Sequence, residues 1–325
     1  MTELTGEWSC TVKDSADNAV LLPAPLEWEI VKSLDSPAHS FEGIFPCARA
    51  CGDLRSVEVK IGGRTLFSGR PDEAAVTEDA DGRRLKLIAR SIGAVLLDNE
   101  ALPQTYTTGL SLTELFDEHI RPYGFSTLIT DFDVFFNQYQ ILKGTSEWEA
   151  LSNFFRNGSQ GIARIDDAGR VVCKMNPGEG SFHRISNRDA GAQRYTCLKI
   201  TDNRYSPITR FVIRDDDGAY SYAYNNPEAS ALGLVRKRYL IPSVEYTLTP
   251  TGGQIDAMLR IRRSMLGKRV VTVTCPGLLD IAVCDTASVS GGYETFEGLL
   301  VHQVRHRLAS SGASTELTLV DRGYL

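Results

Sequence analysis

The histidines at positions 302 and 306 are the first residues whose types and spacing could do chemistry. On a helix this spacing would place His302 and His306 on one face, where two imidazoles can bind zinc. Residues 300–306 instead alternate between apolar and polar side chains, as a strand does. Along a strand the two rings would lie roughly 13 Å apart, too far for one metal ion. We therefore predict that both histidines lie on the solvent face of a strand and bind no metal.

Two further clusters resemble cation sites in part. Cys47 and Cys51 lack a second Cys or His pair at the spacing of a zinc ribbon. Residues 215–218 read Asp-Asp-Asp-Gly, like the start of a calcium loop, but the twelfth position is Asn226 rather than the bidentate glutamate that such a loop needs. We predict buried thiols and a tight acidic turn between strands at 211–214 and 219–222. The seven cysteines are odd in number and form no CxxC, so we expect reduced, mostly buried thiols.

Acid–base catalysis has its best candidates in His119, Glu147 and Glu149. The run Ser146-Glu147-Trp148-Glu149 is a helix capping box, which gives Glu149 a structural role instead. The sequence contains no GxxxxGK[ST], GxGxxG or GxSxG motif. We predict no catalytic, cofactor-binding or metal-binding residues and no enzymatic activity.

Two surfaces could bind a partner. Tyr220, Tyr222 and Tyr224 alternate and would share a strand face, either as an exposed groove for a receptor or carbohydrate or as a packed sheet face. A basic stretch could contact phosphate, although a solvated helix face or a subunit interface explains it as well. Its members are Arg260, Arg262, Arg263, Lys268 and Arg269, with Arg236-Lys237-Arg238 nearby in sequence.

Composition favours a globular protein that does not bind nucleic acid over its whole surface. The chain has 325 residues, 42% of them hydrophobic and 23% charged, with a net charge of -6 and a pI near 5.5. No apolar run is long enough to span a membrane. Residues 1–15 lack the basic and apolar regions of a signal peptide, so we expect the protein to start in the cytoplasm.

The elements that must position these residues follow the order β, α+β, β. Residues 1–100 are β-rich: 57–61 alternate with period two, Gly62-Gly63 permits a turn, and 65–67 return as a second strand. Leu85, Leu87 and Ala89 alternate with basic residues in another strand. We expect a compact sheet or small barrel here.

Residues 101–175 change period. Ser111-Leu112-Thr113-Glu114 is a first capping box, followed by a helix that ends at Pro122 and Gly124. The helix after Ser146 should end at Asn157-Gly158, and a hairpin should occupy 162–173. Residues 176–325 are mainly β, with strands at 198–200, 211–213, 270–274 and 315–319 and one helix at 254–266.

Four blocks in this order resemble the hub proteins of contractile-tail baseplates, the late control D family, as in phages Mu and T4. They are residues 66–98, 110–125, 144–172 and 270–320, and residues 144–151 are similar to the family's G-E-T-x-[aromatic]-E-A-L helix. Residues 89–93 depart from the family, which often has a Gly-Arg-Asp-Lys-type segment there. The first 60 residues match nothing in it.

The resemblance implies an α+β, mainly β fold in which two small β-barrel-like domains, 1–100 and 176–325, flank an α+β domain at 101–175. It also implies a homotrimeric ring in the virion tail baseplate, assembled in the host cytoplasm. Its partners would be the tail tube protein, the central spike protein and other baseplate proteins, with DNA or other cargo passing through. Edge strands at 57–61 and 270–274 would form the ring contacts. The alternatives are a cell-wall hydrolase or peptidase and a receptor-binding component of the tail tip.

Overall fold

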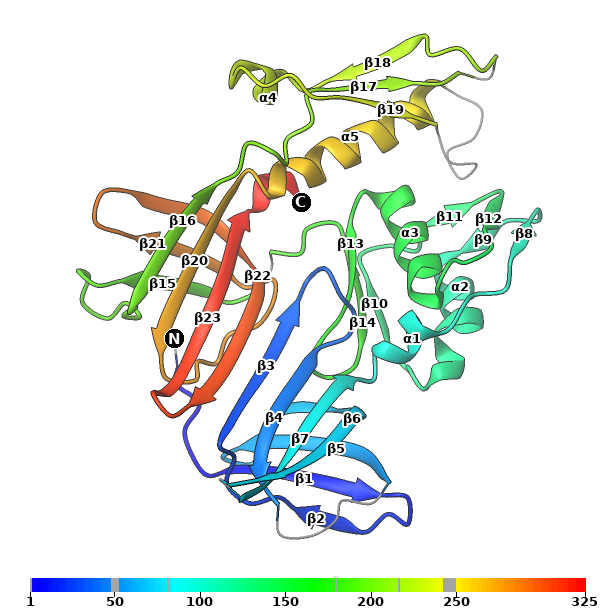
Figure 1. The fold of residues 1–325 in the computed structure, drawn as a ribbon. Coiled ribbons are helices and arrows are strands. Elements are labelled where there is room, and N and C mark those ends of the chain that lie inside the picture. Colours follow the sequence, from blue (N-terminus) through cyan, green and yellow to red (C-terminus); the bar gives the residue numbers. More distant parts are fainter. Residues whose placement is uncertain (1, 48–52, 81, 179, 216, 242–249) are drawn as a thin grey trace.

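The structure is a computed structural model that describes residues 2–47, 53–80, 82–178, 180–215, 217–241 and 250–325. Its two β regions share one continuous sheet (Figure 1). The first region contributes β1 (Trp8–Asp14), β2 (Ala19–Leu21), β3 (Glu27–Ser33), β4 (Ser40–Pro46), β5 (Leu54–Ile61), β6 (Arg64–Asp79) and β7 (Gly82–Ser91). The last contributes β15 (Phe182–Ser186), β16 (Cys197–Asp202), β20 (Arg269–Pro276), β21 (Thr286–Ser290), β22 (Thr295–Ala309) and β23 (Gly312–Asp321).

The strand order in this sheet is β16-β20-β23-β22-β3-β4-β7-β6-β5-β1-β2, and β21 and β15 branch from β22. The long strand β22 joins the two regions, because its first half pairs with β21 and its second half pairs with β3. The predominance of β structure in the first and last regions is thus confirmed.

Period-two alternation accounts for the core of the first β region. Val57, Val59 and Ile61 of β5 are buried, and Gly62 and Gly63 adopt the positive φ that the turn into β6 requires. Leu85, Leu87 and Ala89 of β7 are also buried. These side chains join one apolar cluster with aromatic residues from β3, β4 and β6, so the sheet curls around its own core.

Gly69 is the point at which β6 changes partner, since it pairs with Val57 of β5 on one side and with Ser91 of β7 on the other. A Cβ at this position would lie 2.2 Å from the backbone oxygen of Arg90. Only glycine allows the three strands to approach this closely.

The middle unit packs three helices over short strands. Its elements are α1 (Ala94–Asp98), β8 (Gln104–Tyr106), β9 (Leu110–Ser111), α2 (Leu112–His119), β10 (Leu128–Thr130), β11 (Phe135–Phe136), β12 (Tyr139–Ile141), α3 (Glu147–Ser159), β13 (Ile162–Ile165) and β14 (Val171–Lys174), with a 3₁₀ turn at Arg121–Tyr123. Both capping boxes are present at Ser111 and Ser146. Leu96 already belongs to this core, so the unit begins a little before residue 101.

The predicted end of α3 at Asn157-Gly158 is wrong by two residues. The helix continues to Ser159, and Gln160 adopts the left-handed conformation that caps it. A Cβ at Gly158 would lie 2.1 Å from Cγ1 of Val134, so this glycine allows a close approach inside the helix and does not end it.

A small unit between β16 and β20 was not separated from the last region by sequence. Its elements are β17 (Arg210–Ile213), β18 (Tyr222–Asn225), α4 (Pro227–Ala231), β19 (Lys237–Leu240) and α5 (Pro250–Leu266), and it stands at the top of Figure 1. Phe211, Ile213 and Leu240 pack against Ala257 and Ile261 of α5. The strands predicted at 198–200, 211–213, 270–274 and 315–319 are confirmed, while α5 starts at Pro250 rather than at residue 254.

The strands of the last β region curl toward one another. Gln193, just before β16, donates its backbone N–H to the carbonyl of Arg184, and Ser186 donates to the carbonyl of Gln193. These bonds attach the chain leading into β16 to β15, at the opposite side of the same set of strands. The main pairing path of the described strands still has open ends at β2 and β16.

The predicted edge strands are wrong. Residues 57–61 lie in β5, which pairs with β6 and with β1, and residues 270–274 lie in β20, which pairs with β16 and with β23. Neighbours on both sides occupy their backbone groups, and β-branched alternation alone does not distinguish an inner strand from an edge. Within the described residues, the helices are all too short or too polar to cross a membrane.

Candidate functional site

The residues proposed for acid–base catalysis lie in the core of the middle unit. His119, at the end of α2, is 4% exposed, and its Nδ1 lies 2.7 Å from Oε2 of Glu147 at the start of α3. Tyr106 Oη lies 2.9 Å from His119 Nε2, and Tyr123 donates to Glu147 Oε1 at 3.0 Å. The four side chains therefore satisfy one another's hydrogen bonds, as buried polar groups must.

This network ties two helices to β8 in the core of the middle unit. Burial is the main cause that raises the pKa of Tyr106 and of Tyr123, and nearby carboxylates add to it. Glu149 accepts from the backbone N–H of Ser146 at 2.9 Å, so it caps α3 as predicted. The geometry matches the packing role of these residues and offers no access to a substrate.

The two histidines of β22 do not both lie on the solvent face, so that prediction is wrong for His306. A bulge between Val301 and Gln303 shifts the alternation of side chains, and His306 is 1% exposed beside buried Val304. Its Nε2 donates to the carbonyl of Leu279 at 2.9 Å. The burial lowers the pKa of His306 to about 4, so the ring is neutral at pH 7.

His302 instead lies 3.5 Å from Asp35 Oδ2, and this contact is the main cause that lowers the pKa of Asp35. The backbone N–H of Gly218 donates to the carbonyl of Asp215 at 3.1 Å, and Gly218 has φ 84°, which agrees with the predicted turn. β18 starts only at Tyr222, and Asp216 lies outside the described residues. Cys51 does too, and Cys47 is only partly buried. The described part of the chain contains no group of three His, Cys, Asp or Glu side chains placed to hold a metal ion.

The three tyrosines do not form one groove. Tyr222 and Tyr224 lie in β18, where Tyr224 packs against the core shared with α5. Tyr220 precedes the strand and makes an edge-to-face contact with Tyr239 of β19, at 5.2 Å between ring centroids. Among the basic residues, Arg260 pairs with Asp256, Lys268 with Glu228, and Arg269 with Asp202, so carboxylates of the same chain neutralise these three.

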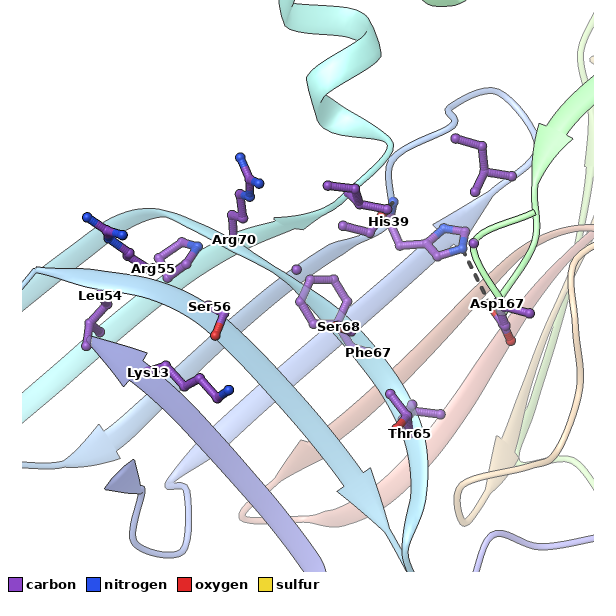
Figure 2. A pocket seen from close by; sticks show the side chains of 18 of the residues that line it. Lys13, His39, Leu54, Arg55, Ser56, Thr65, Phe67, Ser68, Arg70 and Asp167 are labelled. Atoms are coloured by element: carbon purple, nitrogen blue, oxygen red, sulfur yellow. Dashed lines mark hydrogen bonds and ion pairs between the residues drawn. The ribbon is translucent and has the colours of Figure 1, made fainter. Parts of the chain in front are cut away.

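A hollow of about 930 Å³ lies at one end of the first β region, the part of the sheet formed by β1 to β7 and called the first β unit below (Figure 2). The end of β1, the start of β5, the first half of β6 and the end of β7 surround it, and the tip of the β13–β14 hairpin closes one side. Figure 2 shows Lys13, Arg55 and Arg70 around one part of it, with His39 and Asp167 at the other. Sequence reasoning missed this hollow, because its lining comes from six separate segments with no common motif.

Asp167 fixes the hairpin tip to the sheet. Its Oδ1 accepts a hydrogen bond from Lys32 Nζ of β3 at 2.7 Å, and Nε2 of His39 lies 3.5 Å away. The Lys32 side chain is 5% exposed, so this ion pair compensates for the burial of its ammonium group. Burial alone would raise the pKa of Asp167, but His39 and Lys32 outweigh it and hold that pKa well below its usual range.

Solved structures share this fold over nearly the whole chain. The tail protein from Neisseria meningitidis MC58 has a TM-score of 0.75 at 16% identity, covering 98% of this chain and 97% of its own. The 43 kDa tail protein of prophage MuSo2 from Shewanella oneidensis has a TM-score of 0.76 at 16% identity, covering 98% and 99%.

A more distant likeness is to the E. coli c3393 protein, a component of the type VI secretion system described as similar in structure to the T4 tail proteins gp27 and gp5. It has a TM-score of 0.58 at 10% identity and covers 92% of this chain and 74% of its own. No protein-family model and no curated protein sequence matches the chain. At these identities the likeness shows a shared fold with phage-tail and secretion-system structural proteins.

Proposed function

We propose that this chain is the hub of a contractile-tail baseplate, a homotrimeric ring that joins a sixfold tail tube to a trimeric central spike. Each copy would offer two β-barrel-like units, residues 1–100 and 176–325, so that three copies present six similar units to the tube. The opposite face would seat the spike, and other baseplate proteins would bind around the ring. DNA or other cargo would pass through the centre, and the protein would act mechanically rather than as an enzyme.

The observation that carries this proposal is the likeness to two tail proteins over at least 97% of each chain. Two features of the sheet agree with it. The strands around β15 and β16 curl toward closure, and the first β unit curls around its aromatic core. The enzyme alternative has less support, because His119 and Glu147 are buried in a mutually satisfied network.

The sheet also offers edges for contacts between copies. The open ends of its pairing path are β2, whose three residues are exposed, and β16, where Ile200 is 41% exposed. An unpaired strand edge with apolar side chains favours pairing with another chain. Contacts between β2 of one copy and β16 of the next close into a ring only if the rotation from each copy to the next completes a full turn, as it does in a symmetric trimer.

The first test is the solution mass and outline of the purified protein, by light scattering and negative-stain imaging. A particle of three times 35.8 kDa with a central hole is expected. Val20→Lys in β2 should lower the trimer fraction, because a lysine at a strand edge opposes pairing. Val235→Lys is the matched control, at a 97% exposed position outside the sheet ends. A protein that stays monomeric at high concentration, even with candidate spike and tube proteins added, would contradict the proposal.

A further inference from the structure

The hollow at the end of the first β unit has the size of a binding site. Its volume of about 930 Å³ is at the upper end of the range for ligand pockets. It lies where the strands of a curled sheet end, and such mouths commonly bind ligands. The ring contacts proposed at β2 and β16 do not use it, so it calls for a separate explanation.

Positive charge without a partner dominates one wall of the hollow. Lys13 of β1, Arg55 of β5 and Arg70 of β6 are all exposed, and no described carboxylate lies within ion-pair distance of any of them. Arg55 acts only at longer range on Asp14, as the weakest of the causes that lower the pKa of that residue. Three unpaired cations around one concavity in a chain of net charge -6 indicate an anionic ligand.

The acidic residues of the hollow do not neutralise this wall. Asp166 is bound to Arg170 at 2.7 Å, and Asp167 is bound to buried Lys32. Asp17 alone among the acidic lining residues has no described cationic partner. The hollow therefore keeps an excess of positive charge.

His39 supplies a second, independent observation. Its Nε2 faces Asp167 at 3.5 Å, but its Nδ1 is buried and has no hydrogen-bond partner within the described residues. Buried polar atoms without partners are uncommon in folded proteins and call for a missing group. His39 lines the same hollow, so a ligand seated there could hydrogen-bond to it.

The rest of the lining shows which kind of anion fits. Hydroxyl groups also line the hollow: Ser56 lies between Arg55 and Lys13, and Ser68 and Thr65 lie farther along the lining (Figure 2). Partly exposed apolar side chains are interspersed with them: Leu54, Pro71 and Ile92. A free phosphate would leave these apolar surfaces exposed, whereas a peptide with alternating acidic and apolar side chains would cover both kinds of surface.

We propose that this hollow binds an acidic, partly apolar peptide segment of a partner protein. Carboxylates of the segment bind Arg55 and Arg70, since a guanidinium matches a carboxylate with two parallel hydrogen bonds. Lys13 contributes a third positive charge, and apolar side chains of the segment pack near Leu54 and Pro71. The proposal does not depend on the ring, because the lining residues all come from one copy of the chain.

The test is calorimetric titration of the full chain, at low salt, with a capped peptide of alternating glutamate and leucine. Binding is expected, and the double variant Arg55→Gln/Arg70→Gln should weaken it about tenfold or more, since it removes the charged hydrogen bonds of both guanidinium groups. The control Arg204→Gln/Arg238→Gln removes the same charge from exposed residues outside the hollow and should change little. Both variants should keep the wild-type melting temperature.

Three results would overturn the proposal. They are no binding of the peptide at millimolar concentration, equal weakening by both double variants, and equal binding of the peptide with glutamine in place of glutamate. Inorganic phosphate and a short oligonucleotide are titrated in parallel. Binding of either with the same dependence on Arg55 and Arg70 would show that the hollow binds anions in general rather than an acidic peptide. Failure of the ring proposal would leave the peptide titration unchanged, so the two outcomes are distinguishable.

Discussion

Lys32 in the middle of the sheet and Asp167 at the tip of a distant hairpin form an ion pair with 2.7 Å between Nζ and Oδ1. The two residues are 135 positions apart and belong to different units of the chain. The lysine side chain is 5% exposed and the aspartate side chain 46% exposed. The pair therefore holds the middle unit in place at the cost of burying a charge.

Asp167→Ala should destabilise the protein, because it leaves the Lys32 ammonium buried without its partner. We expect a loss of about 2–3 kcal/mol in the free energy of unfolding, less than for a fully buried pair since Asp167 is half exposed. Urea unfolding at pH 7 measures it. Adding Lys32→Met should recover most of the loss, because an apolar side chain needs no partner. Asp117→Ala, which removes an exposed pair with Arg121, is the control and should stay within about 0.5 kcal/mol of wild type. Equal losses for both aspartates would contradict this account.

Acid should destabilise the fold through His306 well before the Asp167 pair is lost. Burial lowers the folded-state pKa of His306 to about 4, against about 6.5 when unfolded. The unfolded state therefore binds the proton more readily, and stability that is present above pH 6.5 is lost as pH falls toward 4. The loss amounts to about 3 kcal/mol at most.

His306→Gln keeps a hydrogen-bond donor near the Leu279 carbonyl but has no titrating group. Unfolding free energies measured from pH 7.5 to 4 should fall less steeply in this variant than in wild type. His302→Gln is the control, because that ring is at the bulge and is not fully buried. Parallel pH profiles for wild type and His306→Gln would show that another group causes the acid sensitivity.

Local sequence patterns predicted where strands and helices lie better than they predicted which strands pair with one another. Alternation at Val57, Val59 and Ile61 correctly predicted a strand, and the capping boxes at Ser111 and Ser146 correctly predicted two helix starts. Both signals depend on residues a few positions apart. Edge position depends on which distant strand pairs alongside, so residues 57–61 and 270–274 were placed at edges although both are inner strands.

The candidate site residues likewise separate into one that local spacing predicts and others whose position depends on the pairing of distant strands. Glu149 was predicted as a cap from its spacing to Ser146, and the structure confirms it. The face on which His306 lies depends on a bulge at position 302, and no local pattern marks that extra residue. The hollow depends on Lys13, Arg55 and Arg70 meeting across three strands, which only the strand register establishes.

Gly69→Ala should disrupt the point at which β6 passes from β5 to β7. The added methyl group would lie 2.2 Å from the Arg90 carbonyl oxygen, and a backbone atom in a paired strand cannot move away freely. We expect a loss of about 2–4 kcal/mol in unfolding free energy. Gly292→Ala is the control, because a Cβ there meets no atom within 4 Å. A thermal unfolding curve for each variant measures the difference in stability. Similar melting temperatures would mean that the strands move apart enough to accept a methyl group at Gly69.

Glu147→Ala distinguishes a packing role from a catalytic one. The change removes the acceptor for Tyr123 and the partner of His119, leaving two polar groups in the core without hydrogen bonds. We expect a loss of about 2–4 kcal/mol in unfolding free energy. Glu118→Ala is the matched control on the neighbouring helix, since that carboxylate is half exposed and 4.0 Å from His119. If Glu147→Ala keeps wild-type stability, the network is not a core element, and a search for hydrolase activity on cell-wall fragments becomes the better experiment. A large loss of stability instead means that Glu147 holds α2 and α3 together, as a rigid structural component requires.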